Sequence, residues 1–260
     1  MSSFHQVKSF VQHWLYEVDE HSIHSPFFFD FYSKTVAKKN RPDIAVLEKL
    51  RTSLLDNDTA LSIEDFGSGG LQQETYKRTI GEITHDSLTP APMALFYLDI
   101  LYYLKARRVV ELGTSLGLTC LYLAQKKDAS IYTFEGSHAI ANVAQSNFEW
   151  AEQKNIELIE GNIDNTLHRF LEQTQKIDFA LIDANHRYGP TMRYYQQLTK
   201  RLYEKSILVI DDIHRSAEME KAWKDIKADV LIYGSVDLYR CGILFFDPIM
   251  NKQHFVWSLK

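Results

Sequence analysis

The residues best able to do chemistry in this 260-residue chain stand at the ends of short apolar runs. One run ends in Glu111-Leu112-Gly113-Thr114-Ser115-Leu116-Gly117, where a carboxylate precedes a turn that contains two glycines. Glycine lets backbone approach a ligand closely, and open α/β sheets bind ligands beyond the carboxyl ends of their strands. The segment therefore predicts a ligand-binding corner between a strand and a helix.

Several interpretations of this corner differ in chemistry. A nicotinamide dinucleotide site requires G-x-G-x-x-G, and Ser115 stands where that pattern has a glycine. The letters G-x-S-x-G also match the nucleophile elbow of serine hydrolases, with Ser115 as nucleophile. Asp183 with His214 or His254 would then complete a triad by chain order alone, but such an elbow usually follows several earlier strands. A bare turn that uses glycine for geometry is a further alternative.

Carboxylates also close three later apolar runs. Glu135 ends the next run, where a carboxylate can accept hydrogen bonds from both hydroxyls of a ribose, or can simply be a surface side chain. Asp183 ends a fourth run, and Asp211 and Asp212 end a fifth. Three carboxylates that meet at one sheet edge repel unless they are protonated or bind a cation, and oxygen ligands suit Mg²⁺ or Ca²⁺.

Two histidines accompany these acids and extend the possible chemistry. His186 follows Asp183 closely, His214 follows Asp212, and imidazole accepts protons near neutral pH. A metal would hold an acceptor hydroxyl and lower its pKa, so that either histidine takes its proton. In the rival interpretation Asp183 binds cofactor or substrate without a metal, and Asp211 or Asp212 caps the next helix.

Strands that alternate with helices must position these residues. The pattern predicts a doubly wound α/β fold with a mostly parallel sheet of seven strands and a C-terminal antiparallel hairpin. We expect an N-terminal helical extension over 1–88 and the main domain over 89–260. The segment 65–70 is expected to be a flexible loop. The expected parallel strands lie at 108–113, 130–136, 156–161, 178–185 and 206–212, and the hairpin strands at 229–236 and 240–247.

From about residue 88 to 247 the chain resembles class I S-adenosylmethionine-dependent methyltransferases. The pattern E-x-G-x-x-x-G is similar to their first motif, and the terminal hairpin is characteristic of their fold. The resemblance implies S-adenosylmethionine as cofactor and a small molecule as methyl acceptor. Leu88-Thr89-Pro90 lies where related O-methyltransferases contact the cofactor. The implied cofactor-binding set is Glu111, Gly113, Thr114, Ser115, Gly117, Glu135, Gly161, Asn162, Ile163 and Asp183, of which Asn162 and its neighbours also suit a turn or cap.

Within that class, the acids resemble those of the catechol and caffeoyl-CoA O-methyltransferases. Asp183, Asp211 and Asp212 match the metal positions of that group. Two departures bear on the metal, because Asp212 replaces an asparagine and His186 stands where the group has its lysine base. The implied catalytic residues are His186, Asp183 and His214. A protein that binds an adenosyl ligand without catalysis is the remaining alternative.

Composition indicates which partners and which location are expected for the protein. A formal net charge of −5 makes nucleic acid a poor default partner, and no apolar stretch is long enough for a membrane span. Two cysteines in apolar runs, Cys120 and Cys241, are expected to be buried. The segment MSSFHQVKSF lacks the basic and apolar pattern of a signal peptide, so none is expected, and the expected location is cytoplasmic. One interpretation of His21, His24 and Ser25 is a lid over the pocket, and the aromatic run at 27–32 is expected to be core or a homodimer contact.

Overall fold

The computed structural model describes residues 2–38, 42–65 and 74–259, and the chain forms two compact units. Met1–Lys38 and Gln173–Lys260 make one, called here the terminal unit, and Lys39–Glu172 makes the other, the middle unit. Most of the loop expected at 65–70 lies outside the described residues. The domain boundary expected at residue 88 stays a prediction.

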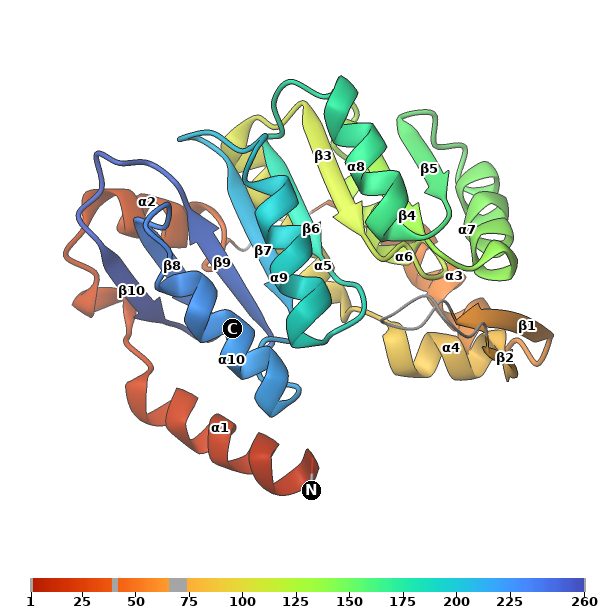
Figure 1. The fold of residues 1–260 in the computed structure, drawn as a ribbon, viewed down its shortest axis with the longest axis horizontal. Helices are drawn as coiled ribbons and strands as arrows, with labels where there is room; N and C mark the ends of the chain where they lie inside the picture. The colour runs from red at the N-terminus through yellow and green to blue at the C-terminus, as the bar shows by residue number, and fades with distance from the viewer. Residues whose placement is uncertain (1, 39–41, 66–73, 260) are drawn as a thin grey trace. The chain divides into compact units, whose positions relative to one another are not determined.

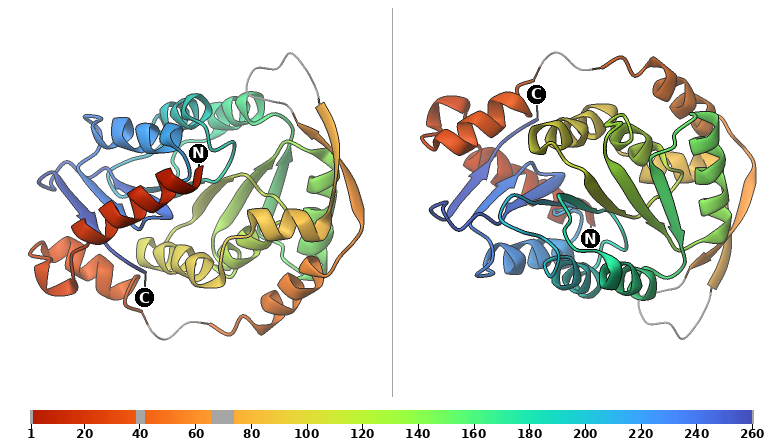
Figure 2. Two further views of the ribbon diagram at one scale, coloured as in Figure 1. Left: turned by 90° about the horizontal axis from the view of Figure 1, so that it is seen from below. Right: turned by 90° about the horizontal axis from the view of Figure 1, so that it is seen from above.

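The middle unit contains three parallel strands in the order β3-β4-β5, together with a separate hairpin. Figure 2 shows α5 and α8 on opposite faces of these strands. Its elements are α3 (Ala45–Leu55), β1 (Ala60–Asp65), β2 (Glu74–Thr79), α4 (Ile80–Ser87), α5 (Ala91–Leu104), β3 (Arg108–Leu112), α6 (Leu118–Leu123), β4 (Ser130–Glu135), α7 (His138–Trp150), β5 (Ile156–Glu160) and α8 (Ile163–Gln173).

Apolar runs form these strands because both of their faces are covered. Val109, Val110 and Ile131 are fully buried, as parallel strands between two helix layers require. On one face the ring of Phe170 in α8 lies 4.8 Å from that of Tyr132, measured between centroids. This packing fixes the layer that brings the carboxyl ends of β3, β4 and β5 to one edge.

The terminal unit carries five strands in the order β10-β8-β9-β7-β6 (Figure 1). Strands β6 and β7 are parallel, β9 runs antiparallel to both β7 and β8, and β10 is parallel to β8. Its elements are α1 (Ser2–Tyr16), the 3₁₀ turn η1 (Glu20–Ser22), α2 (Pro26–Lys34), β6 (Phe179–Ile182), α9 (Tyr188–Leu198), β7 (Ile207–Asp211), α10 (Ala217–Lys227), β8 (Gly234–Asp237), β9 (Cys241–Phe245) and β10 (Gln253–Val256).

Strand β9 carries the core of this unit on both faces. Phe245 meets Phe28 and Phe31 of α2, with ring centroids 5.2 and 5.1 Å apart. Gly242, three positions earlier and therefore on the other face, lies against Trp223 of α10, and a Cβ there would come within 2.5 Å of the indole. Phe28, Phe31 and Tyr32 of the aromatic run are thus core in α2, whereas Phe29, His21 and His24 are exposed. A homodimer contact stays a prediction.

The α/β class, the five strand–helix units and the antiparallel hairpin are confirmed, and three details of the prediction are wrong. The first hairpin strand begins at Gly234 rather than 229, because the chain first turns at the end of α10. Strand β10 adds an eighth strand after residue 108 where seven were expected, and β1 with β2 forms a hairpin in a region expected to be helical. Cys120 and Cys241 are buried, as expected, and neither forms a disulfide bond among the described residues.

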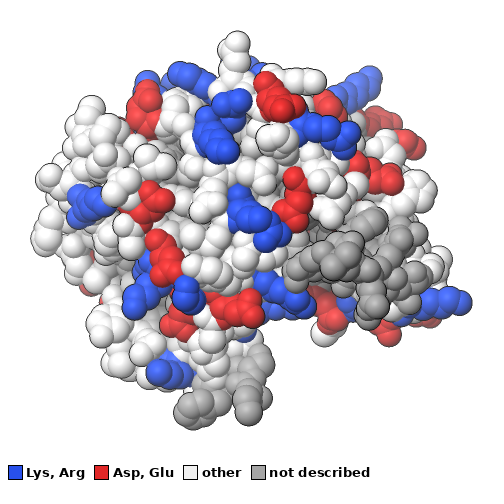
Figure 3. Space-filling model, in the orientation of Figure 1, with Lys and Arg blue, Asp and Glu red and all other residues white. Residues whose placement is uncertain are grey.

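The distribution of charge and the length of the helices both bear on which partners the protein has. Figure 3 shows basic and acidic side chains interspersed over the face that it draws. Within the described part of the chain, the helices are too short or too polar for any of them to cross a bilayer.

Candidate functional site

The glycine corner of the middle unit forms where β3 ends. The N–H groups of Gly113 and Thr114 both donate to the carbonyl oxygen of Phe134 at 3.0 Å, so β4 holds the start of the turn. The backbone φ angles of Gly113, Ser115 and Gly117 are 102°, 48° and 83°, in the left-handed region that favours glycine. Because a residue with left-handed backbone cannot continue a right-handed helix, α6 begins at Leu118, after these residues.

Gly117 has a packing role in addition to its backbone conformation. A Cβ at this position would lie 2.5 Å from Cε1 of Phe148 in α7, closer than real side chains approach. The neighbouring Asn147 donates from Nδ2 to the carbonyl oxygen of Leu116 at 2.8 Å. The second glycine of the motif therefore lets α7 pack against the corner.

Beneath the corner lies a buried chain of hydroxyl and carboxyl groups. Thr114 Oγ1 and Thr133 Oγ1 are 2.7 Å apart, and Thr133 donates to Oε2 of Glu111 at 2.5 Å. Glu111 is fully buried, and its Oε1 lacks a hydrogen-bond partner among the described residues, although the Cys120 thiol, a weak donor, faces the carboxyl group. Burial, opposed in part by the Thr133 hydrogen bond, raises the pKa of Glu111 to about 8.

Glu135 holds the corner rather than pointing into solvent. Its Oε2 accepts from the N–H of Ser115 at 2.9 Å, and its Oε1 accepts from the N–H of Ser137 at 3.0 Å. Burial raises the pKa of this carboxyl group in spite of these hydrogen bonds. A carboxylate oxygen has two lone-pair sites, so each oxygen can still accept from a ligand hydroxyl.

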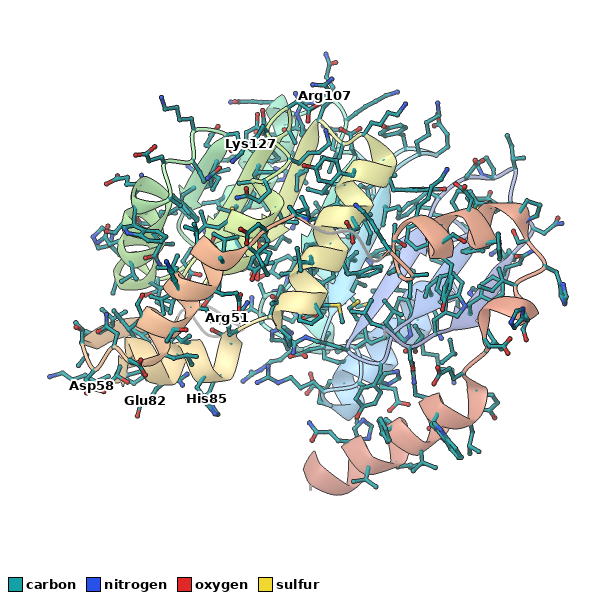
Figure 4. All side chains as sticks on the ribbon, turned by 180° about the vertical axis from the view of Figure 1, so that it is seen from behind. Arg51, Asp58, Glu82, His85, Arg107 and Lys127 are labelled. Carbon is teal, nitrogen blue, oxygen red and sulfur yellow. The ribbon has the colours of Figure 1, made fainter. Side chains whose placement is uncertain are left out.

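Helix α4 reaches the same edge of the middle unit. Figure 4 shows Arg107 and Lys127 at one end of the unit and Glu82 and His85 of α4 at the other; Arg107 precedes β3, so α4 lies towards the carboxyl ends. Ser87 Oγ, at the end of α4, lies 2.9 Å from Ser115 Oγ.

Thr89, two residues after α4, is buried, and its hydroxyl has no partner in the described ranges. This threonine belongs to the segment expected to contact the cofactor.

The segment after β5 adopts the turn-and-cap geometry that was the alternative to adenine contact. Gly161 has φ 121° and donates from its N–H to the carbonyl oxygen of Glu135 at 2.8 Å. Asn162 Oδ1 accepts from the N–H of Asp164 at 2.9 Å, at the start of α8, and Ile163 is buried. An adenine contact of these residues stays a prediction.

The triad expected for a serine hydrolase is not assembled. Ser115 Oγ has a serine hydroxyl, not a histidine, as its hydrogen-bond partner in the described residues. His214 bonds Asp237 rather than Asp183, and His254 Nδ1 lies 2.8 Å from Ser235 Oγ on β8.

In the terminal unit, His186 lies beside two of the predicted acids. Its Nε2 is 3.5 Å from Asp183 Oδ1 and 4.0 Å from Asp212 Oδ2. Burial lowers the pKa of His186, against the opposing charges of Asp212 and Asp211, so the imidazole is neutral near pH 7. Asn185, His186 and Asp212 have φ angles of 62°, 34° and 55°, and such strained backbone gathers at functional sites.

Two of the three predicted metal ligands, Asp211 and Asp212, pair with arginines. Asp211 is fully buried and accepts from Arg240 Nη2 at 3.2 Å, while Asp212 Oδ2 accepts from Arg215 Nη1 at 3.0 Å. No group of three or more His, Cys, Asp and Glu side chains in the described residues is arranged to hold a metal ion. Because the arginines already neutralise two of the acids, this donor set does not fit Mg²⁺ or Ca²⁺, and we derive no step through a metal.

Asp237, at the end of β8, is a buried acid that the sequence did not single out. Its Oδ2 accepts from His214 Nε2 at 2.9 Å and from Trp223 Nε1 at 3.0 Å. These partners come from the loop after β7 and from α10, so no local spacing in the sequence indicates the cluster.

Comparison with known proteins finds one matching family model, which covers part of the chain. A family model described as "Methyltransferase domain" matches residues 110–213, and no curated protein sequence matches the chain.

Several solved structures have the same fold. The O-methyltransferase from Bacillus cereus in complex with S-adenosylhomocysteine has a TM-score of 0.58 at 16% identity, covering 83% of this chain and 99% of that one. A Podospora anserina methyltransferase bound to S-adenosylhomocysteine has a TM-score of 0.55 at 14% identity, with coverages of 80% and 98%. The O-methyltransferase TomG from Streptomyces achromogenes, involved in tomaymycin synthesis and in complex with S-adenosylmethionine, has a TM-score of 0.54 at 17% identity, with coverages of 62% and 82%.

At these identities the structural likeness shows the fold, and the family model adds the domain. The resemblance seen in the sequence is therefore confirmed: residues 110–213 match the model of a methyltransferase domain, and the chain shares its fold with solved methyltransferases.

Proposed function

We propose that the protein transfers the methyl group of S-adenosylmethionine to an oxygen atom of a small molecule. The observation that carries the proposal is the buried carboxyl group of Glu111 beneath the glycine corner, with Oε1 unpartnered among the described residues. A buried carboxyl that lacks a partner costs stability unless a ligand completes it. The O-methyltransferases among the similar structures support oxygen as the methylated atom.

Each end of the cofactor finds suitable groups in the middle unit. Glu111 is suited to the ammonium group of the methionine end, because a nearby cation would draw its carboxyl into the ionised form. Glu135 is suited to the ribose hydroxyls through the lone pairs that its backbone hydrogen bonds leave. Two further sets of contacts are proposed. The residues of the glycine corner contact the cofactor at Gly113, Thr114, Ser115 and Gly117. The segment after β5 lies beside adenine at Gly161, Asn162 and Ile163.

The reaction is a displacement at a sulfonium methyl group, which the cofactor supplies. The protein's tasks are to align the acceptor oxygen with that methyl group, to exclude water and to take the hydroxyl proton. His186 beside Asp183 and His214 beside Asp237 are the two candidate proton acceptors, and both are histidines with a carboxylate at Nε2.

Isothermal titration calorimetry tests the cofactor assignment directly. We expect the full chain to bind S-adenosylmethionine with one-to-one stoichiometry and not to bind NAD. Ser115→Ala should bind the cofactor with at most a modest loss, because its backbone N–H, and not its hydroxyl, bonds Glu135. Binding of NAD alone, or hydrolysis of p-nitrophenyl acetate that Ser115→Ala abolishes, would contradict the proposal.

A further inference from the structure

Helix α1 of the terminal unit turns its polar side towards the protein, next to α10 (Figure 1). Ser9 and His13, four positions apart, are both buried. Ser9 Oγ donates to Oε2 of Glu220 in α10 at 3.4 Å, and His5 Nε2 lies 3.1 Å from the same oxygen. His13 Nε2 lies 3.3 Å from the carbonyl oxygen of Asp237. A row of polar side chains spaced by four residues therefore docks this helix.

The opposite side of α1 is an apolar stripe that faces outward. It consists of two rows with a spacing of four residues, which place all of its side chains on one face of the helix. The rows are Val7, Val11 and Leu15, and Phe10 and Trp14, and each side chain is between 46% and 65% exposed. A surface helix ordinarily packs its apolar stripe on the core and turns its polar side to water. Helix α1 does the reverse, as expected of a helix that binds a second surface through its stripe.

Two further contacts fix the rotation of α1 about its own axis. The hydroxyl of Tyr239 donates to the carbonyl oxygen of Gln6 at 3.0 Å. The ring of Phe10 packs edge-on against Tyr239 with centroids 5.4 Å apart. Turning the stripe inward would break these contacts and would bring apolar side chains against the carboxylates of Glu220 and Asp237, which is unfavourable. The outward orientation of the stripe is therefore a built feature of the unit.

The area of the stripe is sufficient for a dimer. An aromatic side chain presents about 150–250 Å², so the exposed fractions of the five residues correspond to about 600 Å² per copy. Two such stripes would together bury about 1,200 Å², which is the lower bound of specific protein–protein interfaces. The largest apolar patch on a typical monomer is only about 300–600 Å² and is often functional.

Charge favours a second copy of the chain over a lipid surface. Helix α1 contains no acidic residue and one lysine, Lys8, so two stripes can meet without facing acids. Its surroundings are acidic, because Glu17 and Asp19 follow it and Glu218 and Glu220 lie in the first turn of α10. Helices that bind anionic lipid are rich in lysine and arginine, and the acids near α1 would be repelled by such a surface.

The two rows also suit the pairing of α1 with its own copy. Rows spaced by four residues form ridges, and packing such ridges into the grooves between them is the commonest way that helices meet. A two-fold axis at Val11 that reverses the direction of the helix keeps each row opposite the same row of the second copy. Val11 then meets Val11 of the second copy, and Val7 meets its Leu15.

We propose that the apolar stripe of α1 is the interface of a homodimer, in which the two α1 helices pack antiparallel across a two-fold axis near Val11. This interface is separate from the aromatic run of α2, whose Phe28 and Phe31 are core. The inference does not depend on the proposed methyl transfer. An interface of this size is modest, so we expect a dissociation constant of about 1–50 μM.

Sedimentation velocity of the full chain, at concentrations from about 1 to 200 μM, tests the dimer. The variants are Val11→Asp and Trp14→Ala, and their matched controls are Val46→Asp on α3 and Trp150→Ala on α7. The controls make the same changes at side chains of the middle unit that are 59% and 54% exposed. All four side chains are exposed in the single chain, so the variants should fold with the circular dichroism spectrum of the wild type.

We expect the wild type to dimerise and Val11→Asp to stay monomeric, because that change brings two carboxylates together at the axis. Trp14→Ala should raise the dissociation constant about 30-fold or more, as for an aromatic residue central to an interface. Both controls should stay within about twofold of the wild type. With dissolved oxygen as oxidant, Val11→Cys should form a disulfide-linked dimer, and Gln12→Cys, exposed but outside the stripe, should not.

Four results would overturn the proposal. The first is a wild type that stays monomeric at the highest concentration, and the second is a dimer that persists in Val11→Asp. The third is a monomer that binds vesicles of phosphatidylcholine and phosphatidylserine and loses this binding in Trp14→Ala, which would make the stripe a lipid contact. The fourth is a wild-type dimer whose Val11→Cys variant forms no disulfide, because the two copies of Val11 would then not meet.

Discussion

The N–H of Ser115 donates to Oε2 of Glu135 at 2.9 Å, so the carboxylate suited to a ribose also holds the strained residue of the glycine corner. The other oxygen of Glu135 holds the N–H of Ser137, at the start of α7. One side chain thus connects the corner after β3 with the turn after β4. Binding of a nucleoside and the shape of the corner should therefore depend on each other.

This relationship predicts the effect of Glu135→Gln. The amide retains one acceptor oxygen for two N–H donors, and it loses the negative charge that strengthens hydrogen bonds from ligand hydroxyls. We expect Kd for S-adenosylmethionine to rise about 10- to 100-fold, which corresponds to about 1.5–3 kcal/mol, together with a lower Tm. Calorimetry checks the affinity. Glu157→Gln, an exposed change on β5, is the control, and equal affinities in the two variants would contradict the role of Glu135.

The buried carboxyl of Glu111 predicts a pH dependence of stability. Its pKa rises from an ordinary value of 4.5 to about 8 in the folded protein, chiefly through burial. Between these values the folded state binds more protons than the unfolded state, so the free energy of unfolding falls as pH rises. This contribution is complete below about pH 4.5 and is lost as pH passes through about 8.

Glu111→Gln isolates that contribution, because the amide is neutral at every pH. In the absence of cofactor, we expect the free energy of unfolding of the wild type to fall relative to that of the variant between pH 5 and pH 8.5, by an amount on the order of a few kcal/mol. The Tm of the wild type should fall relative to that of the variant over the same range. Thermal unfolding at half-unit intervals of pH checks this difference. Parallel curves for the two proteins would mean that the carboxyl is ionised when folded.

Much of the sheet could be predicted because burial on both faces leaves a local signature. Runs such as Ile207–Asp211 are apolar up to their last residue, and turn residues bound them. Strands β1 and β2 lack that signature, since half of ALSIED and most of ETYKRT is polar, and within the described residues the two strands pair with each other. Strand β10 is four residues long and forms by pairing with β8. Strand β9 separates the two in the sequence, so no local pattern indicates the pairing.

The candidate site residues likewise fall into those that a local sequence pattern indicates and those that it does not. Glu111 and Glu135 could be named because a carboxylate at a strand end is visible in the sequence, and the parallel strands β3 and β4 bring their carboxyl ends to one edge of the middle unit. The partner of Asp211 is Arg240, and the partners of Asp237 are His214 and Trp223. These contacts join separate elements, so no spacing in one segment predicts them, and they decide which acids remain available for a ligand.

The pairing of Asp211 with Arg240 predicts that a divalent metal is not required. A fully buried carboxylate that accepts from a guanidinium at 3.2 Å already has its compensating charge, and a cation would have to displace the arginine. We expect Mn²⁺, titrated while its free electron paramagnetic resonance signal is followed, to show no binding below about 1 mM; structural cation sites of proteins are commonly far tighter. One equivalent of tightly bound Mn²⁺ that Asp211→Asn abolishes would contradict this prediction.

The packing of Gly117 against Phe148 predicts that even a methyl group at the corner is costly. In Gly117→Ala the Cβ would meet the Phe148 ring at 2.5 Å, and alanine must also adopt φ 83°. Left-handed backbone costs about 1–2 kcal/mol and overpacking about 1–3 kcal/mol, so we expect a loss of about 2–5 kcal/mol in urea unfolding.

Gly189→Ala is the matched control for this variant. Gly189 lies in the first turn of α9, and its Cβ would be 3.5 Å from Arg193 Nη1, an ordinary contact with the end of a flexible side chain. Alanine is the better helix former, so this variant should be as stable as the wild type or more stable by up to about 1 kcal/mol. Phe148→Leu should restore part of the stability of Gly117→Ala, because a smaller side chain removes the clash and leaves only the backbone cost. A double variant that is additive instead would show that the ring does not confine the corner.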